Sequence, residues 1–209
     1  MTTDPAERWI DPVREPEDRF FTQMFATTRA IVVLRGADPE EAVARAAEAW
    51  DAGVEAVEVT IAERRDVPAL EAVADAARAR GMTVGAGSIY RPAQVHVAVE
   101  AGADYLVSPG IDRDVSLACR ARGLPHLPGV STASEIIQAE RLGHVWLKVF
   151  PARELGSAWI SAMTGPFPWA RWVATGGVTA ESGPRFLAAG CAAVGMGRKC
   201  DDWSWARVS

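Results

Sequence analysis

The sequence predicts an α/β protein built as a single (β/α)8 barrel, with an N-terminal helix and a shortened or missing eighth helix. A unit recurs in which an apolar helix ends at a glycine and an apolar strand begins two or three residues later. These glycines recur roughly every 20–30 residues, which is the length of one β-α step. The strands are similar in length, and no G-x-G-x-x-G sequence opens a helix after the first strand. Both features favour a closed barrel (TIM barrel) over the alternative, an open doubly wound sheet.

Residues 1–28 are expected to form a helical lead-in, and residues 29–209 the barrel. Apolar side chains in the segment 19–25 are spaced for one amphipathic helix. Asp38 is suited to cap the first barrel helix with Pro39 at its first position, and Gly53 ends that helix. Strands are expected at 30–34, 57–60, 83–88, 105–109, 126–130, 144–150, 171–177 and 192–197. Few residues remain after Gly197, so the last helix has little room, and the N-terminal helix is a candidate to cover the surface left open.

Length and composition exclude several classes of protein. A chain of 209 residues with 49% hydrophobic content can bury one sizeable core. Its net charge is −5 and its basic residues are scattered, which argues against a nucleic-acid partner. No apolar run is long enough to cross a membrane, and the polar N-terminus has no signal-peptide pattern. Three cysteines without C-x-x-C spacing are typical of a reduced, cytoplasmic protein.

Lys148 is the candidate catalytic residue. It lies in the apolar, β-prone stretch 144–152, where a lone ammonium must lose its proton or find a partner. Only Lys148 and Lys199 are lysines among the 22 basic residues. Arg cannot form an imine, whereas a desolvated Lys can. The alternative is a chain generally poor in Lys, with Lys148 reaching solvent from a strand end.

Glu58 is the candidate proton carrier. It lies between Val57 and Val59, so it should face the barrel interior while its neighbours face the helices. A catalytic carboxylate there would move protons beside the amine. The alternative is a structural ion pair of Glu58 with Lys148 or Arg35.

Two glycine-rich turns follow the last two strands of the predicted barrel. They are Thr175-Gly176-Gly177, which precedes a helix, and Gly195-Met196-Gly197. Backbone N–H groups at such turns bind anions, and these loops commonly hold phosphate in barrels. No His, Asp and Glu cluster has metal-ligand spacing. The three histidines, far apart in sequence, are expected to be surface or packing residues: His96, His126 and His144.

Seven motifs, in order along the chain, resemble the 2-keto-3-deoxy-6-phosphogluconate (KDPG) and 4-hydroxy-2-oxoglutarate (KHG) aldolase family. They are Val33-Leu34-Arg35-Gly36, Val57-Glu58-Val59-Thr60, Gly85-Ala86-Gly87-Ser88, Ser108-Pro109-Gly110, Pro128-Gly129-Val130-Ser131-Thr132, Leu147-Lys148-Val149-Phe150-Pro151-Ala152 and Thr175-Gly176-Gly177-Val178. The resemblance implies a class I aldolase, usually a homotrimer, that acts on a 2-keto acid through a Schiff base and needs no metal or other cofactor.

By the same resemblance, Lys148 forms the Schiff base and Glu58 carries protons. Arg35 and Thr175 would hold the pyruvate carboxylate, and Pro109 and Phe150 would shape its pocket. The full set of expected substrate-binding residues is Arg35, Thr60, Ser88, Pro109, Phe150, Thr175, Gly176, Gly177, Gly197 and Arg198.

The chain departs from the family at two positions near the predicted site. Ala62 stands where many members carry Arg, and Arg198 stands where the family has a Ser that contacts phosphate. Two roles are open for Arg198. Its guanidinium could bind a phosphate or a carboxylate through two hydrogen bonds, or its side chain could fill the phosphate pocket. Trp203 and Trp205 lie near the end of the chain. They suit either a contact between subunits or covering of the surface that the missing helix leaves open.

Three other functions stay open at this point. One is a related imine-forming dehydratase or decarboxylase. Another is a barrel that has become a binding or assembly protein, and the third is a metal-dependent aldolase.

Overall fold

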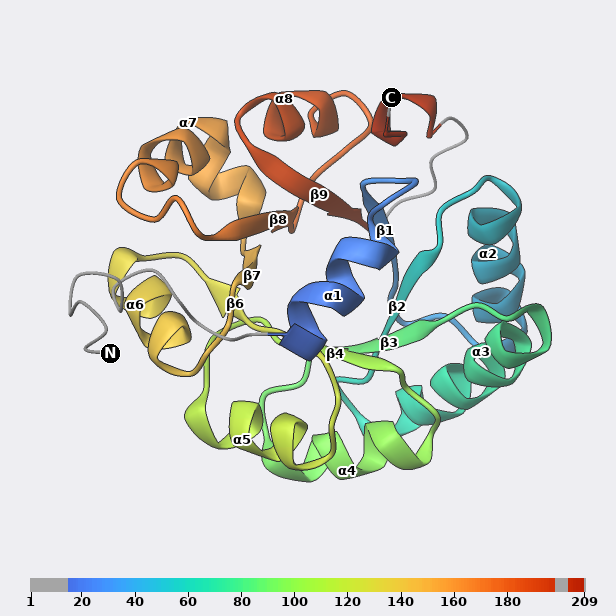
Figure 1. The fold of residues 1–209 in the computed structure, drawn as a ribbon. Coiled ribbons are helices and arrows are strands. Elements are labelled where there is room, and N and C mark those ends of the chain that lie inside the picture. The colour runs from blue at the N-terminus through green and yellow to red at the C-terminus, as the bar shows by residue number, and fades with distance from the viewer. Residues whose placement is uncertain (1–14, 198–202, 209) are drawn as a thin grey trace, which may run out of the picture.

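The computed structural model describes residues 15–197 and 203–208, and these form a barrel of parallel strands surrounded by helices (Figure 1). The sheet order is β5-β4-β3-β2-β1-β9-β8-β7-β6, with every pairing parallel. The strands are β1 (Ala30–Leu34), β2 (Ala56–Thr60), β3 (Val84–Gly87), β4 (Tyr105–Val107), β5 (His126–Leu127), β6 (Gly129–Val130), β7 (Trp146–Val149), β8 (Arg171–Thr175) and β9 (Cys191–Met196). The predicted (β/α)8 barrel is confirmed.

Nine strands replace the expected eight because Pro128 divides one of them. Proline has no backbone N–H, so the ladder is interrupted between β5 and β6. Its carbonyl still accepts a hydrogen bond of 2.8 Å from the backbone N–H of Lys148. Since β5 pairs with β4 and β6 pairs with β7, the ring closes through this interrupted strand.

The helices follow the strands in alternation. They are α1 (Glu15–Met24), α2 (Pro39–Asp51), α3 (Val67–Arg80), α4 (Pro92–Glu100), α5 (Arg113–Ala121), α6 (Ala133–Arg141), α7 (Ala152–Thr164) and α8 (Gly183–Ala188). Asp38 caps α2 as predicted, because its side chain accepts a 2.9 Å hydrogen bond from the backbone N–H of Glu41. After β9, the described residues form only the 3-10 turn η3 (Ser204–Ala206), so no α-helix follows the last strand among them, as expected. None of the helices described is long and apolar enough to span a bilayer.

The N-terminal helix closes the amino end of the barrel instead of covering the surface beside β9. Phe21 of α1 is fully buried, and its ring lies 6.0 Å from that of Tyr105, the first residue of β4. The ring of Phe25 lies 5.3 Å from that of Trp146, the first residue of β7. Figure 1 shows α1 across the centre of the ring of strands. The expectation that it would replace the missing helix was wrong, because its aromatic face packs against the inward side chains of the barrel.

The C-terminal tryptophans take over that covering role. Trp203 is buried, and its ring stacks on that of Trp205 with centroids 6.0 Å apart. Trp205 lies so close to Gly183 of α8 that a Cβ at that glycine would be 2.4 Å from the indole. Trp203 and Trp205 therefore seal the barrel flank within this chain. The C-terminal segment that carries them lies beside α8 (Figure 1).

Candidate functional site

A cavity of about 270 Å³ opens at the carboxyl ends of β1, β7, β8 and β9. Seven of the predicted site residues line it: Arg35, Lys148, Phe150, Thr175, Gly176, Gly177 and Gly197. Val33, Arg153, Val178, Thr179 and Gly195 complete the described lining. Strand ends of a barrel converge in this way because all strands run in the same direction.

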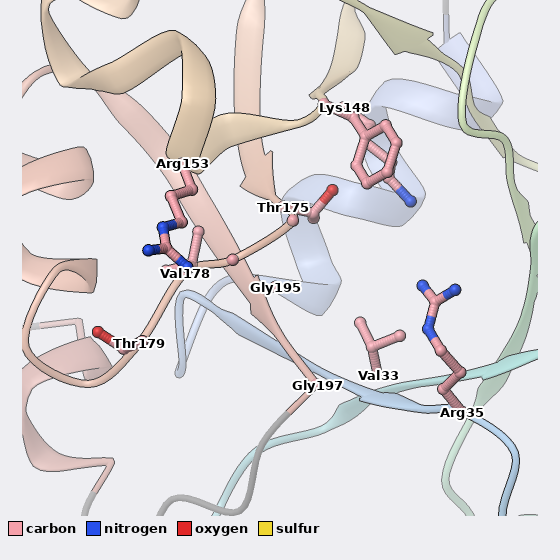
Figure 2. Close-up of a pocket in the computed structure, with 12 residues that line it drawn as sticks. Val33, Arg35, Lys148, Arg153, Thr175, Val178, Thr179, Gly195 and Gly197 are labelled. Atoms are coloured by element: carbon pink, nitrogen blue, oxygen red, sulfur yellow. The ribbon is translucent and has the colours of Figure 1, made fainter.

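Lys148 lies at the inner end of this cavity, and only 6% of it is exposed. Its strand neighbours are Gly129 and Val173, and its Nζ lies 5.0 Å from the centre of the Phe150 ring. In Figure 2 the Lys148 amine and the Arg35 guanidinium point toward the same space. Within the described part of the chain, no ion pair involves Lys148. The amine is therefore buried, and no carboxylate of the described residues pairs with it.

Glu58 faces the barrel interior, as its place between two valines predicted. It is 1% exposed, whereas Val57 and Val59 pack in the layer between strands and helices. Three strand positions separate β2 from β7 on either side of the ring, so Glu58 and Lys148 approach the centre from opposite walls. Among the described residues, Oε2 of Glu58 has no hydrogen-bond partner, and no ion pair joins the carboxylate to Lys148 or Arg35. The structural ion pair considered for Glu58 is not formed.

Gly87 makes room for this carboxylate. A Cβ on Gly87 would lie 1.9 Å from Oε1 of Glu58, far inside van der Waals contact. Gly85, two residues earlier, makes room in the same way for the ring of Tyr105. Burial, reinforced by the nearby Glu58, raises the pKa of Tyr105 well above 10.0, so its neutral hydroxyl donates to the Val57 carbonyl at 2.8 Å. The Gly85-Ala86-Gly87 motif thus serves the packing of the barrel interior.

Besides Glu58, three predicted site residues that the structure describes do not line the cavity: Thr60, Ser88 and Pro109. Thr60 and Ser88 lie on the Glu58 side of the barrel, where Thr60 is buried and pairs with Gly87. Ser88 has a φ of 63°, a left-handed conformation that costs a non-glycine residue about 1–3 kcal/mol. Pro109 follows β4, and its carbonyl fills the space beside Gly129. Arg198, which was also predicted to bind substrate, lies outside the described residues.

The Gly176-Gly177 turn has the features of an anion site. Both glycines have positive φ, 90° and 75°. Within the described residues, no acceptor takes the backbone N–H of Gly177 or Val178. Thr175, just before the turn, has a buried Oγ1 that also has no described partner. Unpaired donors beside a cavity are suited to bind carboxylate or phosphate oxygens.

Two polar residues of the cavity, Arg153 and Thr179, were missed from sequence. Arg153 is the second residue of α7 and follows Pro151 of the cis Phe150–Pro151 peptide by two positions; its backbone N–H donates to the Gly176 carbonyl at 2.9 Å. Figure 2 shows it beside Val178 and Thr179, away from Lys148. The signal was its position directly after the Lys148 motif, at the carboxyl end of the strand.

Two of the histidines come together, although not as a metal site. His126 Nε2 lies 2.7 Å from Ser108 Oγ, and Ser116 Oγ lies 3.4 Å from His126 Nδ1 and 3.1 Å from His144 Nε2. Burial lowers the pKa of His126 well below 6.5. In the described part of the chain, no three His, Cys, Asp or Glu residues are grouped to hold a metal. Both histidines are buried packing residues, as expected, whereas His96 is exposed and lies 3.2 Å from Glu100.

Comparison with known proteins points to one family. Residues 22–208 match the family model described as KDPG and KHG aldolase. The chain is 34% identical over 168 residues to the 2-dehydro-3-deoxy-6-phosphogalactonate aldolase of Escherichia coli, covering 80% of this chain and 82% of that one. Among solved structures, it is similar to the KDPG aldolase of Legionella pneumophila with pyruvate captured as a covalent carbinolamine, with a TM-score of 0.76, 30% identity and coverage of 82% and 84%. The KDPG aldolase of Zymomonas mobilis with 3-phosphoglycerate gives a TM-score of 0.77, 29% identity and 85% coverage of both chains. With the barrel, the buried lysine and the glycine turns in place, these matches show that the chain belongs to the KDPG and KHG aldolase family.

Proposed function

We propose that this protein is a class I aldolase that cleaves a 2-keto-3-deoxy sugar acid, in its 6-phosphorylated form or without phosphate. The products are pyruvate and an aldehyde such as glyceraldehyde 3-phosphate. The observation that carries the proposal is Lys148, a buried amine without a described acidic partner at the mouth of a barrel of this family. The carbinolamine captured in the Legionella relative supports imine chemistry in the same fold.

In the proposed reaction, neutral Lys148 attacks the C2 ketone, and loss of water gives an iminium ion. A base removes the proton of the C4 hydroxyl, and the C3–C4 bonding electrons flow into the iminium. The aldehyde then leaves. The remaining enamine takes a proton at C3, and water releases pyruvate and regenerates the amine. Glu58, on the opposite wall of the barrel, is the proposed proton carrier, directly or through a water molecule.

The carboxylate of the substrate is assigned to Arg35 and Thr175. Arg35 is directed toward the space that Lys148 faces (Figure 2). Thr175 has a buried hydroxyl, held in place by Gly195, where a Cβ would lie 2.6 Å from its methyl group. Phe150 and Pro109 shape the keto-acid pocket, with Thr60 and Ser88 on the Glu58 side. Gly176, Gly177, Gly197 and Arg198 are assigned to the distal end of the substrate.

Borohydride trapping tests the imine. We expect pyruvate and borohydride to add one reduced pyruvyl group to the peptide that contains Lys148. The Lys148→Arg variant should keep the fold and lose both the label and the activity. Labelling of Lys199, the only other lysine, would place the chemistry elsewhere.

Glu58→Gln should slow turnover far more than it weakens pyruvate binding. An equal loss in turnover and in pyruvate binding would leave Glu58 a structural role.

The alternatives make different predictions in simple assays. A dehydratase or decarboxylase would give other products from a panel of keto acids. A binding or assembly protein would not exchange the methyl protons of pyruvate with deuterium. A metal-dependent aldolase would lose activity in chelator, whereas the imine mechanism retains it.

We further propose that the enzyme is a cytoplasmic homotrimer that needs neither a metal nor an organic cofactor. Cys119 and Cys191 are both buried, and the three cysteines of the chain have no C-x-x-C spacing, which suits a reducing compartment. Light scattering should give three times the 22.4 kDa mass of one chain. A monomer would leave the aldolase proposal standing and remove the trimer.

A further inference from the structure

A second cavity of about 450 Å³ adjoins the first on the side of α7 and α8. The two cavities share three lining residues, Arg153, Gly177 and Thr179. The outer cavity is completed by Gly156, Ser157, Ser182, Arg185 and Phe186. A path therefore runs from the Lys148 amine, past the Gly176-Gly177 turn, into a space bounded by two guanidinium groups.

The described lining of this outer space is cationic. It contains Arg153 and Arg185, together with hydroxyl groups of three residues, and no Asp or Glu. Within the part of the chain that is described, neither arginine side chain has an ion pair or hydrogen bond, although Arg45, Arg65, Arg78 and Arg80 each pair with an acid. An unpaired guanidinium beside a cavity is suited to hold a carboxylate or phosphate with two parallel hydrogen bonds.

Gly177 fixes where Arg153 lies. A Cβ on Gly177 would be 2.7 Å from Cβ and 2.8 Å from Cδ of Arg153, so the stem of the arginine crosses directly over the glycine backbone. The Arg153 backbone is also tied to the Gly176 carbonyl. The stem of Arg153 is thereby held against Gly177, and Figure 2 shows its guanidinium beside Val178, on the side of the inner cavity away from Lys148.

The geometry points to Arg153 as the residue that selects substrates by their terminal anion, with Arg185 as an outer, weaker contact. This inference rests on the proposed aldolase function. A six-carbon 2-keto-3-deoxy acid attached at Lys148 directs its C6 end toward the glycine turn. A phosphate ester or a carboxylate at that end would meet the Arg153 guanidinium, whereas an uncharged C6 hydroxyl would gain little from it.

The test compares three substrates of equal carbon length, bearing at C6 a phosphate ester, a carboxylate or a hydroxyl. For Arg153→Gln we expect kcat/KM to fall about tenfold or more with the preferred anionic substrate, and less than threefold with the hydroxyl substrate. Arg153→Lys, which keeps the charge but not the planar fork, should recover part of the loss. Arg185→Gln should show a smaller fall with the same selectivity. Arg141→Gln, on an exposed arginine in the last turn of α6 and outside both cavities, is the matched control.

Comparing kcat/KM for the phosphate and carboxylate substrates shows which terminal anion the protein prefers. Equal losses of kcat/KM for all three substrates, or no loss for any, would overturn the role of Arg153. Borohydride trapping at Lys148 is scored in the same variants with pyruvate. If trapping succeeds in wild type and the substrate selectivity does not change, only this inference fails. If trapping fails in wild type, the aldolase proposal itself fails.

Discussion

Replacing Gly87 with Ala should disable the enzyme by moving Glu58, without altering any polar group. The new Cβ would lie 1.9 Å from Oε1, 2.6 Å from Cδ and 2.8 Å from Cγ of Glu58. Ordinary contact requires about 3.5 Å, so the carboxylate must shift by about 1.6 Å. Overpacking of this kind costs about 1–3 kcal/mol of stability. A misplacement of about 1 Å in a catalytic group can reduce the rate about 100-fold.

The assay is deuterium exchange into the methyl group of pyruvate, which needs the Lys148 imine and a proton carrier but no aldehyde. We expect Gly87→Ala to exchange about 100-fold more slowly than wild type, while borohydride still labels Lys148. Urea denaturation should show an unfolding free energy lowered by about 1–3 kcal/mol. Gly165→Ala is the matched control, because Gly165 has a helical φ of −61° and no atom closer than 4.0 Å to the position that the added methyl group would take.

A double-mutant cycle decides whether the effect passes through Glu58. If it does, Gly87→Ala combined with Glu58→Gln should exchange no more than about twofold more slowly than Glu58→Gln alone, because the displaced group is already inactive. Multiplicative losses would refute this reasoning. So would a folded Gly87→Ala protein that exchanges within about threefold of wild type.

Three further predictions concern stability. His126 has a pKa well below 6.5 in the folded protein, so the unfolded chain binds a proton first as the pH falls. The stability that neutral His126 contributes is therefore complete above pH 6.5 and is lost below that pH at up to about 1.4 kcal/mol per pH unit. The urea unfolding midpoints of wild type and His126→Asn should converge as the pH falls. Phe21→Ala should lower the unfolding free energy by about 3–5 kcal/mol, because Phe21 is fully buried. The kcat of the folded variant should be unchanged, since Phe21 lies at the end of the barrel away from Lys148. A large fall in kcat would contradict that separation. Gly183→Ala should cost about 1–3 kcal/mol through contact with Trp205, and a similar cost in a Trp205→Ala background would show that the contact is not the cause.

Much of the barrel and the inner part of the site could be predicted from local patterns. Lys148 and Glu58 were identifiable because each interrupts an apolar strand, and strand alternation alone assigns Glu58 to the interior. The glycine turns were identifiable because their loops follow the last strands of a barrel. The catalytic roles of these residues stay predictions until the trapping and exchange experiments are done.

Other features depend on contacts that only ring closure creates. His126 of β5 and His144, two residues before β7, meet because closure of the ring brings β5 into contact with β7, which spacing along the chain does not reveal. Arg153 resembles any exposed arginine near a helix start until Gly177 is seen beneath it. The amphipathic pattern of α1 predicted a helix but could not say which apolar surface would receive it, because inner and outer surfaces of the barrel are both hydrophobic.

The aromatic seal formed by α1 gives the barrel a blind end. Any molecule that reaches the Lys148 amine must then enter and leave by the same opening. In the proposed reaction a long substrate therefore lies with its keto-acid half innermost. In that reaction the pyruvate part is still attached to Lys148 as the enamine when the aldehyde forms nearer the opening, so the aldehyde is the first product released. Inhibition patterns should reflect this order, with pyruvate competing directly against the cleaved substrate and the aldehyde failing to do so.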